Sequence, residues 1–243
     1  MLKILRRLFE SFLPISFSRY AMQVYGLLRR PINSYSQKGE DILINVFFKN
    51  KKDGFYLDIG CFHPKWISNT HSLHNKGWSG YAVDLDDYKL DFFRKYRGKR
   101  VKTLKKAVVG KKSNKKVRTV YKFRTKLGWS DIDTLDKETA DLKKKTGWGD
   151  YICEEIEIID INSLLSQFEQ VDFLNIDVEG MDVEIIHAID FKRFKIPLIV
   201  FEDTKNYGGS DATVKVLQSN NYKHLFTSGG SVGFFLEKGL QFK

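Results

Sequence analysis

The stretch FYLDIGC, residues 55–61, decides the fold, and the stretch FLNIDVEG, residues 173–180, repeats its pattern. Each is a short apolar run that stops at an acid and is followed by a glycine. Such runs are typical of buried parallel strands whose carboxyl ends open into a ligand site. A third run, GYAVD at residues 80–84, also ends on an acid. Three acids at one edge of a sheet predict a crevice for a small polar cofactor.

The remaining pattern alternates strands with helices and ends in a hairpin. Strands are expected at residues 54–59, 80–85, 101–109, 117–123, 155–159, 173–176 and 197–202, and the closing hairpin pairs residues 222–227 with 233–237. Helices are expected after Ser36 and at residues 70–76, 87–96, 162–168, 181–189 and 211–220, with a short helix within residues 131–146. This order predicts an α/β fold, with a mostly parallel sheet, helices on both faces and an antiparallel C-terminal hairpin.

The chain divides into a short arm, residues 1–33, and one domain, residues 34–243. The arm is basic and carries apolar residues at helical spacing, but its apolar stretch is too short to span a bilayer. It also lacks the pattern of a secretory signal. We expect a helix that packs on the domain or in a homo-oligomer interface, and a helix lying on a membrane surface is the alternative.

The charge of the chain is concentrated in one segment. The formal net charge is +11, yet residues 89–126 contain seventeen Lys or Arg and one acid, Asp91, so the rest of the chain is slightly acidic. The segment is either a landing surface for an anionic polymer or membrane, or a solvated basic face without a specific partner. The only cysteines, Cys61 and Cys153, predict neither a disulfide framework nor a zinc site, which favours the cytoplasm.

The first strand end is unlike that of a dinucleotide-binding protein. Such a fold places three glycines there because the backbone must approach a pyrophosphate. Here Gly60 is followed by bulky residues, among them His63-Pro64-Lys65. A smaller cofactor without phosphates therefore fits better. Asp84, at the end of the second strand, is placed to accept the hydroxyls of a ribose.

Together these pieces resemble S-adenosylmethionine-dependent methyltransferases of the FkbM type, over about residues 34–237. The matching pieces are Ser36-Gln37 with Glu40-Asp41, Leu57-Asp58-Ile59-Gly60, Ser68-Asn69-Thr70, Gly77-Trp78 with Gly80, Asp84, and Asp177-Val178-Glu179-Gly180. The departure is His63-Pro64-Lys65, where a small residue or glycine is usual in the family. The resemblance implies a Rossmann-like class I methyltransferase sheet.

The resemblance also implies a set of residues that bind S-adenosylmethionine: Gln37, Asp58, Gly60, Cys61, Asn69, Thr70, Asp84, Leu85 and Ala107. Asp58 and Gly60 are expected beside the methionine part of the cofactor, and Asp84 at its ribose. Ala107 is expected near the adenine.

Methyl transfer requires an acceptor held in line with the methyl group and a way to remove its proton. Asp177 and Glu179 are the leading candidates for the base, and His63 is a competitor together with His71 and His74. A metal-assisted version places one Mg²⁺ between Asp177, Glu202 and Asp203, because carboxylate oxygens are its preferred ligands.

Family members mostly methylate hydroxyl groups, often on sugars. The expected function is therefore an O-methyltransferase that acts on a sugar, a glycan or a related small molecule. The alternative is a non-catalytic module that binds an anionic polymer through residues 89–126. A third interpretation keeps the enzyme and makes RNA the acceptor.

Overall fold

The computed structural model describes residues 34–123, 130, 132–203 and 211–237 of the chain. The arm expected at residues 1–33 lies outside these ranges, as do residues 124–126 of the basic segment. The division into arm and domain therefore stays a prediction. Within the described ranges, no helix combines the length and the apolar character needed to cross a membrane.

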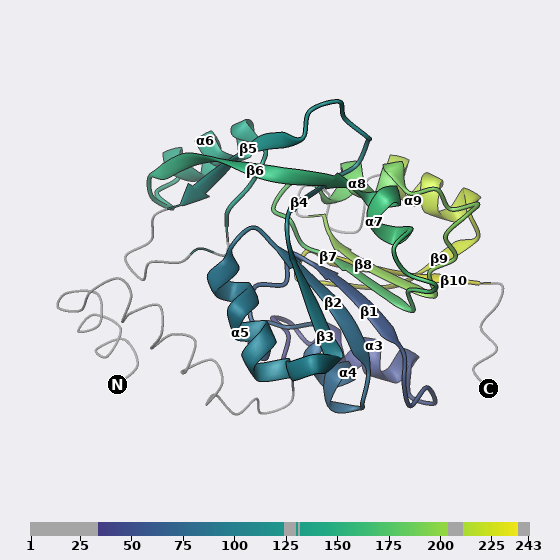
Figure 1. The fold of residues 1–243 in the computed structure, drawn as a ribbon. Coiled ribbons are helices and arrows are strands. Elements are labelled where there is room, and N and C mark those ends of the chain that lie inside the picture. The colour runs from purple at the N-terminus through teal and green to yellow at the C-terminus, as the bar shows by residue number, and fades with distance from the viewer. Residues whose placement is uncertain (1–33, 124–129, 131, 204–210, 238–243) are drawn as a thin grey trace.

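A seven-stranded sheet forms the centre of the molecule, with the strand order β3-β2-β1-β7-β8-β10-β9 (Figure 1). Its strands are β1 (Phe55–Ile59), β2 (Ser79–Asp84), β3 (Val101–Lys105), β7 (Phe173–Ile176), β8 (Leu198–Glu202), β9 (Tyr222–Ser228) and β10 (Ser231–Leu236). All neighbours pair in parallel except β10, which is antiparallel to both β8 and β9. The predicted α/β fold and its C-terminal hairpin are confirmed.

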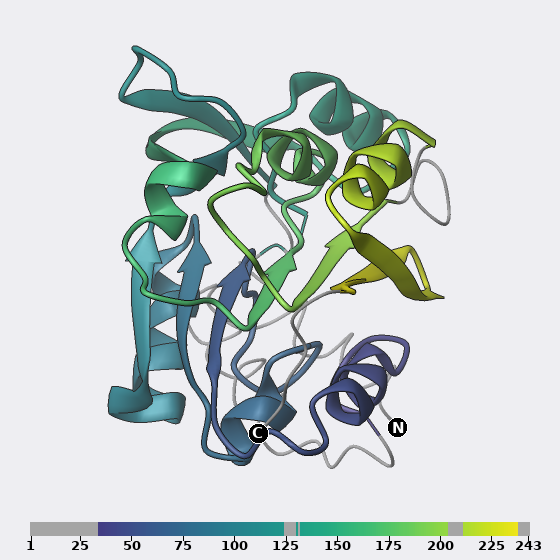
Figure 2. The ribbon, with the colours of Figure 1, turned by 90° about the vertical axis from the view of Figure 1, so that its right-hand side faces the viewer.

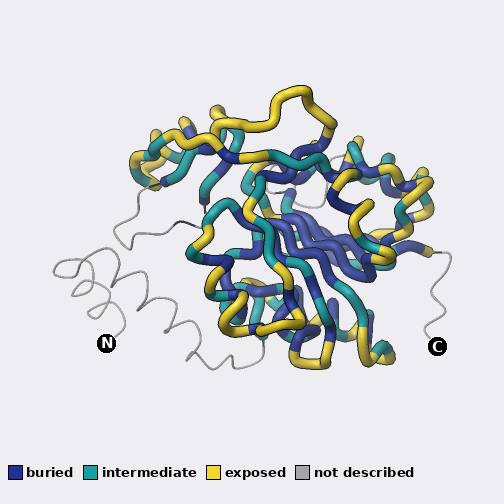
Figure 3. Tube along the Cα trace, in the orientation of Figure 1, coloured by how far each residue is buried: buried dark blue, intermediate teal, exposed yellow. Residues whose placement is uncertain are grey.

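Helices cover both faces of this sheet (Figure 2). Helices α3 (Glu40–Phe47), α4 (His71–Asn75) and α5 (Asp87–Arg97) pack on one face, and α7 (Ile161–Leu165), α8 (Asp182–Ala188) and α9 (Asp211–Ser219) on the other. Successive side chains of a strand point to opposite faces. Along β1, Leu57 and Ile59 therefore join the core under α7–α9, whereas Tyr56 joins the core under α3–α5. The central strands β1, β7 and β8 are buried along almost their whole length (Figure 3).

A second, smaller layer lies beyond the carboxyl ends of β1, β2 and β3, which point toward it in Figure 2. It contains β4 (Ala107–Val109), β5 (Val117–Phe123), α6 (Lys137–Lys145) and β6 (Tyr151–Asp160). Its three strands have the order β4-β6-β5, and β6 pairs in parallel with β4 and antiparallel with β5. This layer places residues 132–145 over the edge where the acids were expected.

One expected strand was wrong. Residues 101–109 do not form a single strand, because the chain leaves the large sheet at Lys106 and continues as β4 in the small one. Burial explains the change: residues 101–105 are only partly buried at the sheet edge, whereas Ala107, Val108 and Val109 are all buried. Gly110 then lies against α8, where an added Cβ would come within 2.7 Å of the Glu184 carbonyl oxygen.

Two local expectations also differ from the structure. The strand expected at residues 155–159 extends over Tyr151–Asp160, since pairing with β5 sets Lys122 beside Glu154. Ser36 is not the residue that caps the first helix, because Gly39 holds that position. The Ser36 hydroxyl instead accepts hydrogen bonds from the amides of Gly39 and Asp41, at 3.1 and 3.2 Å.

Candidate active site

The crevice lies where the strand order reverses. β1 is flanked by β2 on one side and by β7 on the other. The strands that follow β1 are therefore added first on one side of it, as β2 and β3, and later on the other side, as β7 and β8. Ligands of open α/β sheets bind outside the carboxyl ends of the strands at such a point. Asp58, Asp84 and Asp177, at or just after these strand ends, line the recesses found there. The structure thus brings together the three acids that the sequence placed at one edge.

Gly60 allows the loops after β1 and β7 to approach closely. Its φ is +82°, and an added Cβ would lie 1.7 Å from the carbonyl oxygen of Asp177. The amides of Gly60 and Cys61 both donate to the carbonyl oxygen of Val83, at 2.9 and 3.2 Å. A side chain at position 60 would therefore separate the loops that form the crevice.

Two adjoining recesses occupy the crevice. The first encloses about 560 Å³, including space open to solvent, and is lined by Ile59, Gly60, Phe62, Val83, Asp84, Leu85, Lys89, Lys106, Ala107, Val108, Asp133, Leu135, Asp177, Val178 and Glu179. The second encloses about 740 Å³ and is lined by Gln37, Glu40, Asp58, Gly60, Cys61, Phe62, Ile67, Ser68, Asn69, Asn175, Asp177, Glu179, Glu202 and Ser231. Every expected cofactor residue except Thr70 lines one of them.

Asp58 is the centre of a buried polar network. Its two carboxylate oxygens accept hydrogen bonds from Thr70 Oγ1 at 2.6 Å and from Asn175 Nδ2 at 2.9 Å. The side-chain Oδ1 of Asn175 in turn accepts a hydrogen bond from Asn69 Nδ2 at 2.9 Å. Burial raises the pKa of Asp58, while the charge of Arg97 and these hydrogen bonds oppose the rise. Thr70 therefore contacts Asp58 and does not itself line a recess.

Asn175 and Arg97 were not identified from the sequence. Asn175 lies directly opposite Asp58 in the β1–β7 register, and a polar residue inside the apolar run at 173–176 was the signal for it. Arg97 shares a helical spacing with Leu90 and Phe93, which are buried, and that spacing was its only signal.

The buried guanidinium of Arg97 anchors the loop that departs from the family pattern. It donates to the Pro64 carbonyl oxygen from Nε and from Nη2, at 2.9 and 2.6 Å. It also donates to the hydroxyls of Thr70 and Ser68, each at 2.8 Å. Residues 63–65 are therefore held by α5.

His63 lies in this loop and not in the crevice. It is buried and lines neither recess. Its Nδ1 accepts hydrogen bonds from the amides of Lys65 and Trp66, at 3.0 and 2.8 Å. The structure does not bring this expected catalytic residue to Asp177 or Glu179.

The competing histidines, His71 and His74, lie under α5. Burial, followed by the positive charge of Arg97, lowers the pKa of His71 to about 3. The same two causes, with a contribution from Arg100, lower the pKa of His74 to about 4. Both rings are neutral at physiological pH, and neither lines a recess.

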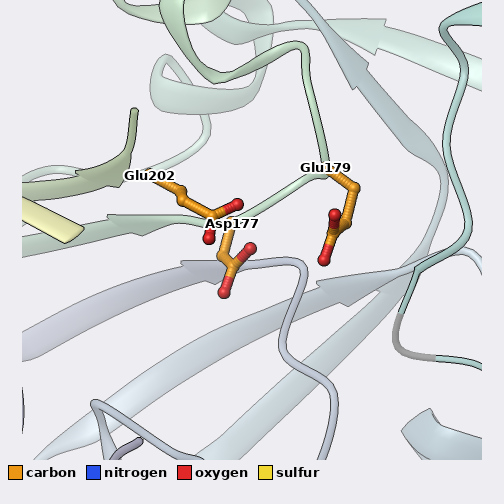
Figure 4. A group of neighbouring side chains, drawn as sticks. All are labelled: Asp177, Glu179 and Glu202. Atoms are coloured by element: carbon orange, nitrogen blue, oxygen red, sulfur yellow. The ribbon is translucent and has the colours of Figure 1, made fainter. Parts of the chain in front are cut away.

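Three carboxylates converge where the recesses meet (Figure 4). Asp177 follows β7, Glu179 lies two residues later, and Glu202 ends β8. One oxygen from each lies within 4.8 Å of the others. The metal set expected from the sequence is therefore arranged differently, since Glu179 joins Asp177 and Glu202. Asp203 is buried, and its amide donates to the Gly230 carbonyl oxygen at 2.9 Å.

Two members of this cluster, Asp177 and Glu202, have raised pKa values. Asp177 lies deep in the crevice, yet its side chain remains open to the recess. Reduced hydration, followed by repulsion from Glu202 and Asp182, raises the pKa of Asp177 well above its usual range. Reduced hydration and the charge of Glu179 raise the pKa of Glu202 to about 7. Both carboxyl groups of the Asp177–Glu202 pair therefore keep their protons to a higher pH than isolated acids do.

The second layer holds the loop that carries Glu179. Glu179 has a φ of +58°, and its carbonyl oxygen accepts a hydrogen bond from Thr134 Oγ1 at 2.8 Å. Its carboxylate pairs with Lys143 Nζ of α6 at 2.5 Å. On the other side, the Asp182 carboxylate accepts from the amides of Val178 and Gly180, each at 3.2 Å. Contacts from both layers thus set the position of Glu179.

Comparison with known proteins identifies the family. The family model described as the methyltransferase FkbM domain matches residues 51–224. The chain belongs to the FkbM methyltransferase family. It is thus a methyltransferase that uses S-adenosylmethionine, and its sheet is of the Rossmann-like class I type, as the sequence predicted. Comparison with curated proteins gives no match.

Solved structures with a similar fold are distant from this FkbM-family chain. A TehB-like S-adenosylmethionine-dependent methyltransferase from Corynebacterium glutamicum is 13% identical, with a TM-score of 0.47, and the match covers 93% of this chain and 100% of that one. An O-methyltransferase from Bacillus cereus, in complex with S-adenosylhomocysteine, is 13% identical, with a TM-score of 0.36 and coverages of 94% and 93%.

Proposed function

We propose that this FkbM-family enzyme transfers a methyl group from S-adenosylmethionine to a hydroxyl group of a sugar, a glycan or a related small molecule. The observation that carries the proposal is the shared wall between the two recesses. Asp177 and Glu179 line both of them. A cofactor in one recess and an acceptor in the other would meet beside these two carboxylates, and the pKa of Asp177 is raised well above its usual range.

The first recess suits the nucleoside part of the cofactor. Leu85, Ala107 and Val108 provide apolar surface for a flat base, and Asp84 provides a carboxylate for the ribose hydroxyls. Gly60 keeps the backbone close to the space between the recesses. S-adenosylmethionine supplies a methyl group that its sulfonium has already activated, so the protein must orient the acceptor and remove its proton.

Asp177 is our leading candidate for the base. An alcohol is a poor nucleophile, and a general base works best when its pKa lies near the working pH. The raised pKa of Asp177 and the value of about 7 for Glu202 meet that condition. Glu179 is engaged by Lys143, which suits a positioning role. His63 lines neither recess, so the proposal assigns it no chemical step.

The lining of the second recess favours an uncharged polyhydroxyl acceptor. Its acids are Glu40, Asp58, Asp177, Glu179 and Glu202, and among the residues the structure describes no Lys or Arg lines it. Phosphate groups of a nucleic acid would be repelled there. The side-chain amide of Gln37 offers a donor and an acceptor of the kind that sugar hydroxyls use, whereas Asn69 and Asn175 bond to each other and to Asp58. This lining argues against RNA as the acceptor.

In a second arrangement, the same three carboxylates bind one divalent ion. Asp177, Glu179 and Glu202 offer three oxygen ligands, which is chemistry that Mg²⁺ accepts. The pairing of Glu179 with Lys143 already neutralises one of these charges. Assay after removal of metal with a chelator separates the two arrangements: full activity supports the carboxylate base alone, and loss restored by Mg²⁺ supports the metal.

Calorimetric titration with S-adenosylhomocysteine tests the cofactor half of the proposal. We expect binding at about micromolar strength, equivalent to about 8 kcal/mol. Asp84→Asn should weaken it at least tenfold, whereas Asp91→Asn, an exposed acid on α5, should not. A wild-type protein that releases no heat and gains no thermal stability with this ligand would refute the proposal.

The acceptor half needs a turnover assay with neutral sugars, anionic glycans and RNA as methyl acceptors. We expect transfer to a neutral sugar hydroxyl and its loss in Asp177→Asn with cofactor binding retained. Transfer to RNA alone would overturn the acceptor class. Homo-oligomer formation, a membrane or anionic partner and a cytoplasmic location stay predictions.

A further inference from the structure

Lys89 is a buried lysine on the wall of the first recess. It lies on α5, and its exposed surface is only 5%. Its Nζ lies 3.5 Å from Asp84 Oδ1 and 5.5 Å from the ring centre of Phe62, over the ring face. A buried ammonium needs such partners because dehydration of a charge is costly.

A second carboxylate, Asp133 of the small layer, acts on the same ammonium. Burial lowers the pKa of Lys89, but the charges of Asp84, Asp133 and Asp86, together with Cys61, outweigh it, so the pKa is raised. Asp133 is itself held in place, since its Oδ1 accepts a hydrogen bond from the Phe123 amide at 2.9 Å. Lys89 thus lines the first recess together with an acid of the large sheet, Asp84, and an acid of the second layer, Asp133.

The contacts of Asp84 leave one of its oxygens for a ligand. Oδ1 accepts from the Asp86 amide at 3.0 Å and faces Lys89 Nζ. Among the described residues, none donates a hydrogen bond to Oδ2. A carboxylate held through one oxygen presents the other in a defined direction, which suits a ribose diol.

The second layer continues from Asp133 to the carboxylate cluster. Thr134, the next residue, donates to the Glu179 carbonyl oxygen, and Lys143 donates to the Ile132 carbonyl oxygen at 3.2 Å and pairs with Glu179. One short stretch of this layer therefore reaches both places: Asp133 lines the first recess, and Thr134 contacts Glu179 of the cluster.

We propose that Lys89 is a positioning residue for the cofactor, which directs Asp84 toward the ribose diol and ties it to Asp133 of the second layer. This inference rests on the proposed function, because it requires that Asp84 binds the ribose. It assigns to Lys89 a part in the recognition of the ribose 2′-hydroxyl. It also makes cofactor recognition depend on the layer that positions Glu179.

The test compares the affinities of S-adenosylhomocysteine and its 2′-deoxyribosyl analogue, by calorimetry on the full chain. The ratio of the two affinities does not depend on the fraction of protein that is folded, so it separates positioning from stability. We expect wild type to prefer the ribosyl ligand about tenfold or more. Lys89→Met should reduce the preference to about twofold or less, whereas Lys89→Arg should retain most of it.

Two further variants complete the design. Lys95→Met removes an exposed lysine of the same helix and should behave as wild type. Asp133→Asn removes the second-layer partner and should lower the preference in the same direction as Lys89→Met. If Lys89→Met binds the ligands with the wild-type ratio, the inference is wrong even though the cofactor binds. If wild type binds neither ligand, the proposed function itself fails.

Discussion

At the scale of single residues, Gly60 is the position where a small change has the largest predicted effect. Gly60→Ala combines a left-handed backbone, φ +82°, with a Cβ placed 1.7 Å from the Asp177 carbonyl oxygen. Backbone strain alone costs about 1–3 kcal/mol, and the clash adds to it. Gly147→Ala is the matched control, because Gly147 has a φ of +87° and no atom within 4 Å of an added Cβ.

Urea denaturation should therefore show a loss of about 1–3 kcal/mol of unfolding free energy for Gly147→Ala, from backbone strain alone, and a larger loss for Gly60→Ala. We also expect Gly60→Ala to lose affinity for S-adenosylhomocysteine, because the loops after β1 and β7 must separate. Equal losses in the two variants would mean that the close contact with Asp177 is not a constraint.

The negative charge of Glu202 beside Asp177 predicts how the rate of methyl transfer depends on pH. The base acts when it has lost its proton, and the pKa of Asp177 is raised well above its usual range, partly by the charge of Glu202, whose own pKa is about 7; activity should therefore rise with pH. Glu202→Gln removes a neighbouring negative charge, so Asp177 ionises at lower pH. The pH profile of kcat/KM should move its rising limb to lower pH. Glu169→Gln, an exposed control, should leave the limb unchanged.

At the scale of elements, the start of α6 carries a cap that should matter for the site. The Asp136 carboxylate accepts hydrogen bonds from the amides of Glu138 and Thr139. Asp136→Ala should cost about 0.5–2 kcal/mol of unfolding free energy, whereas Asp136→Asn should cost less, because asparagine also caps helices. Thermal denaturation measures the difference. Since α6 carries Lys143, the alanine variant should also lower kcat more than it weakens cofactor binding.

The elements also show where local pattern was insufficient. The helix at 87–97 and the strands at 55–59 and 173–176 follow from periodicity and from their flanking acids and glycines, and they were predicted within a few residues. The separation of β3 from β4 was missed, because both stretches have strand character. Only the presence of β6 and α8 as neighbours decides which sheet each stretch joins.

At the scale of the whole molecule, buried acids set a pH dependence of stability. Burial is the main cause that raises the pKa values of Asp182 and Glu202 to about 7, from 3.8 and 4.5. The folded protein therefore holds protons that the unfolded chain has released. Their stabilising effect is fully present below about pH 4 and is lost as pH rises through 7. The melting temperature should fall between pH 5 and 8.5, and Glu202→Gln should reduce the fall; an unchanged slope would contradict this account.

Less of the positive charge in the basic segment is exposed and unpaired than the sequence implied. Within residues 89–123, Lys89 and Arg97 are buried, and Lys105, Lys106 and Lys122 pair with acids. The loop at residues 111–116, between β4 and β5, remains fully exposed, with Lys111, Lys112, Lys115 and Lys116. If the chain has an anionic partner, this loop is its best contact surface.

Replacing the four loop lysines by serine should lower the salt concentration at which the protein elutes from heparin, with binding of S-adenosylhomocysteine unchanged. The matched control replaces four exposed lysines elsewhere, Lys49, Lys52, Lys76 and Lys192. Equal shifts in the two proteins would show that total charge, not this loop, governs the interaction.

The sequence by itself determined the α/β class, the strand ends that carry Asp58, Asp84 and Asp177, and the choice of a cofactor smaller than a dinucleotide. These follow from local patterns, because the carboxyl ends of parallel strands meet at one edge whatever lies around them. The tertiary structure alone decided the partners of those acids: Asn175 and Thr70 for Asp58, and Lys89 for Asp84. It also placed Glu179 beside Lys143 and left His63 outside the crevice. Such contacts join residues far apart in the chain, and strand register and helix packing select them rather than any local spacing.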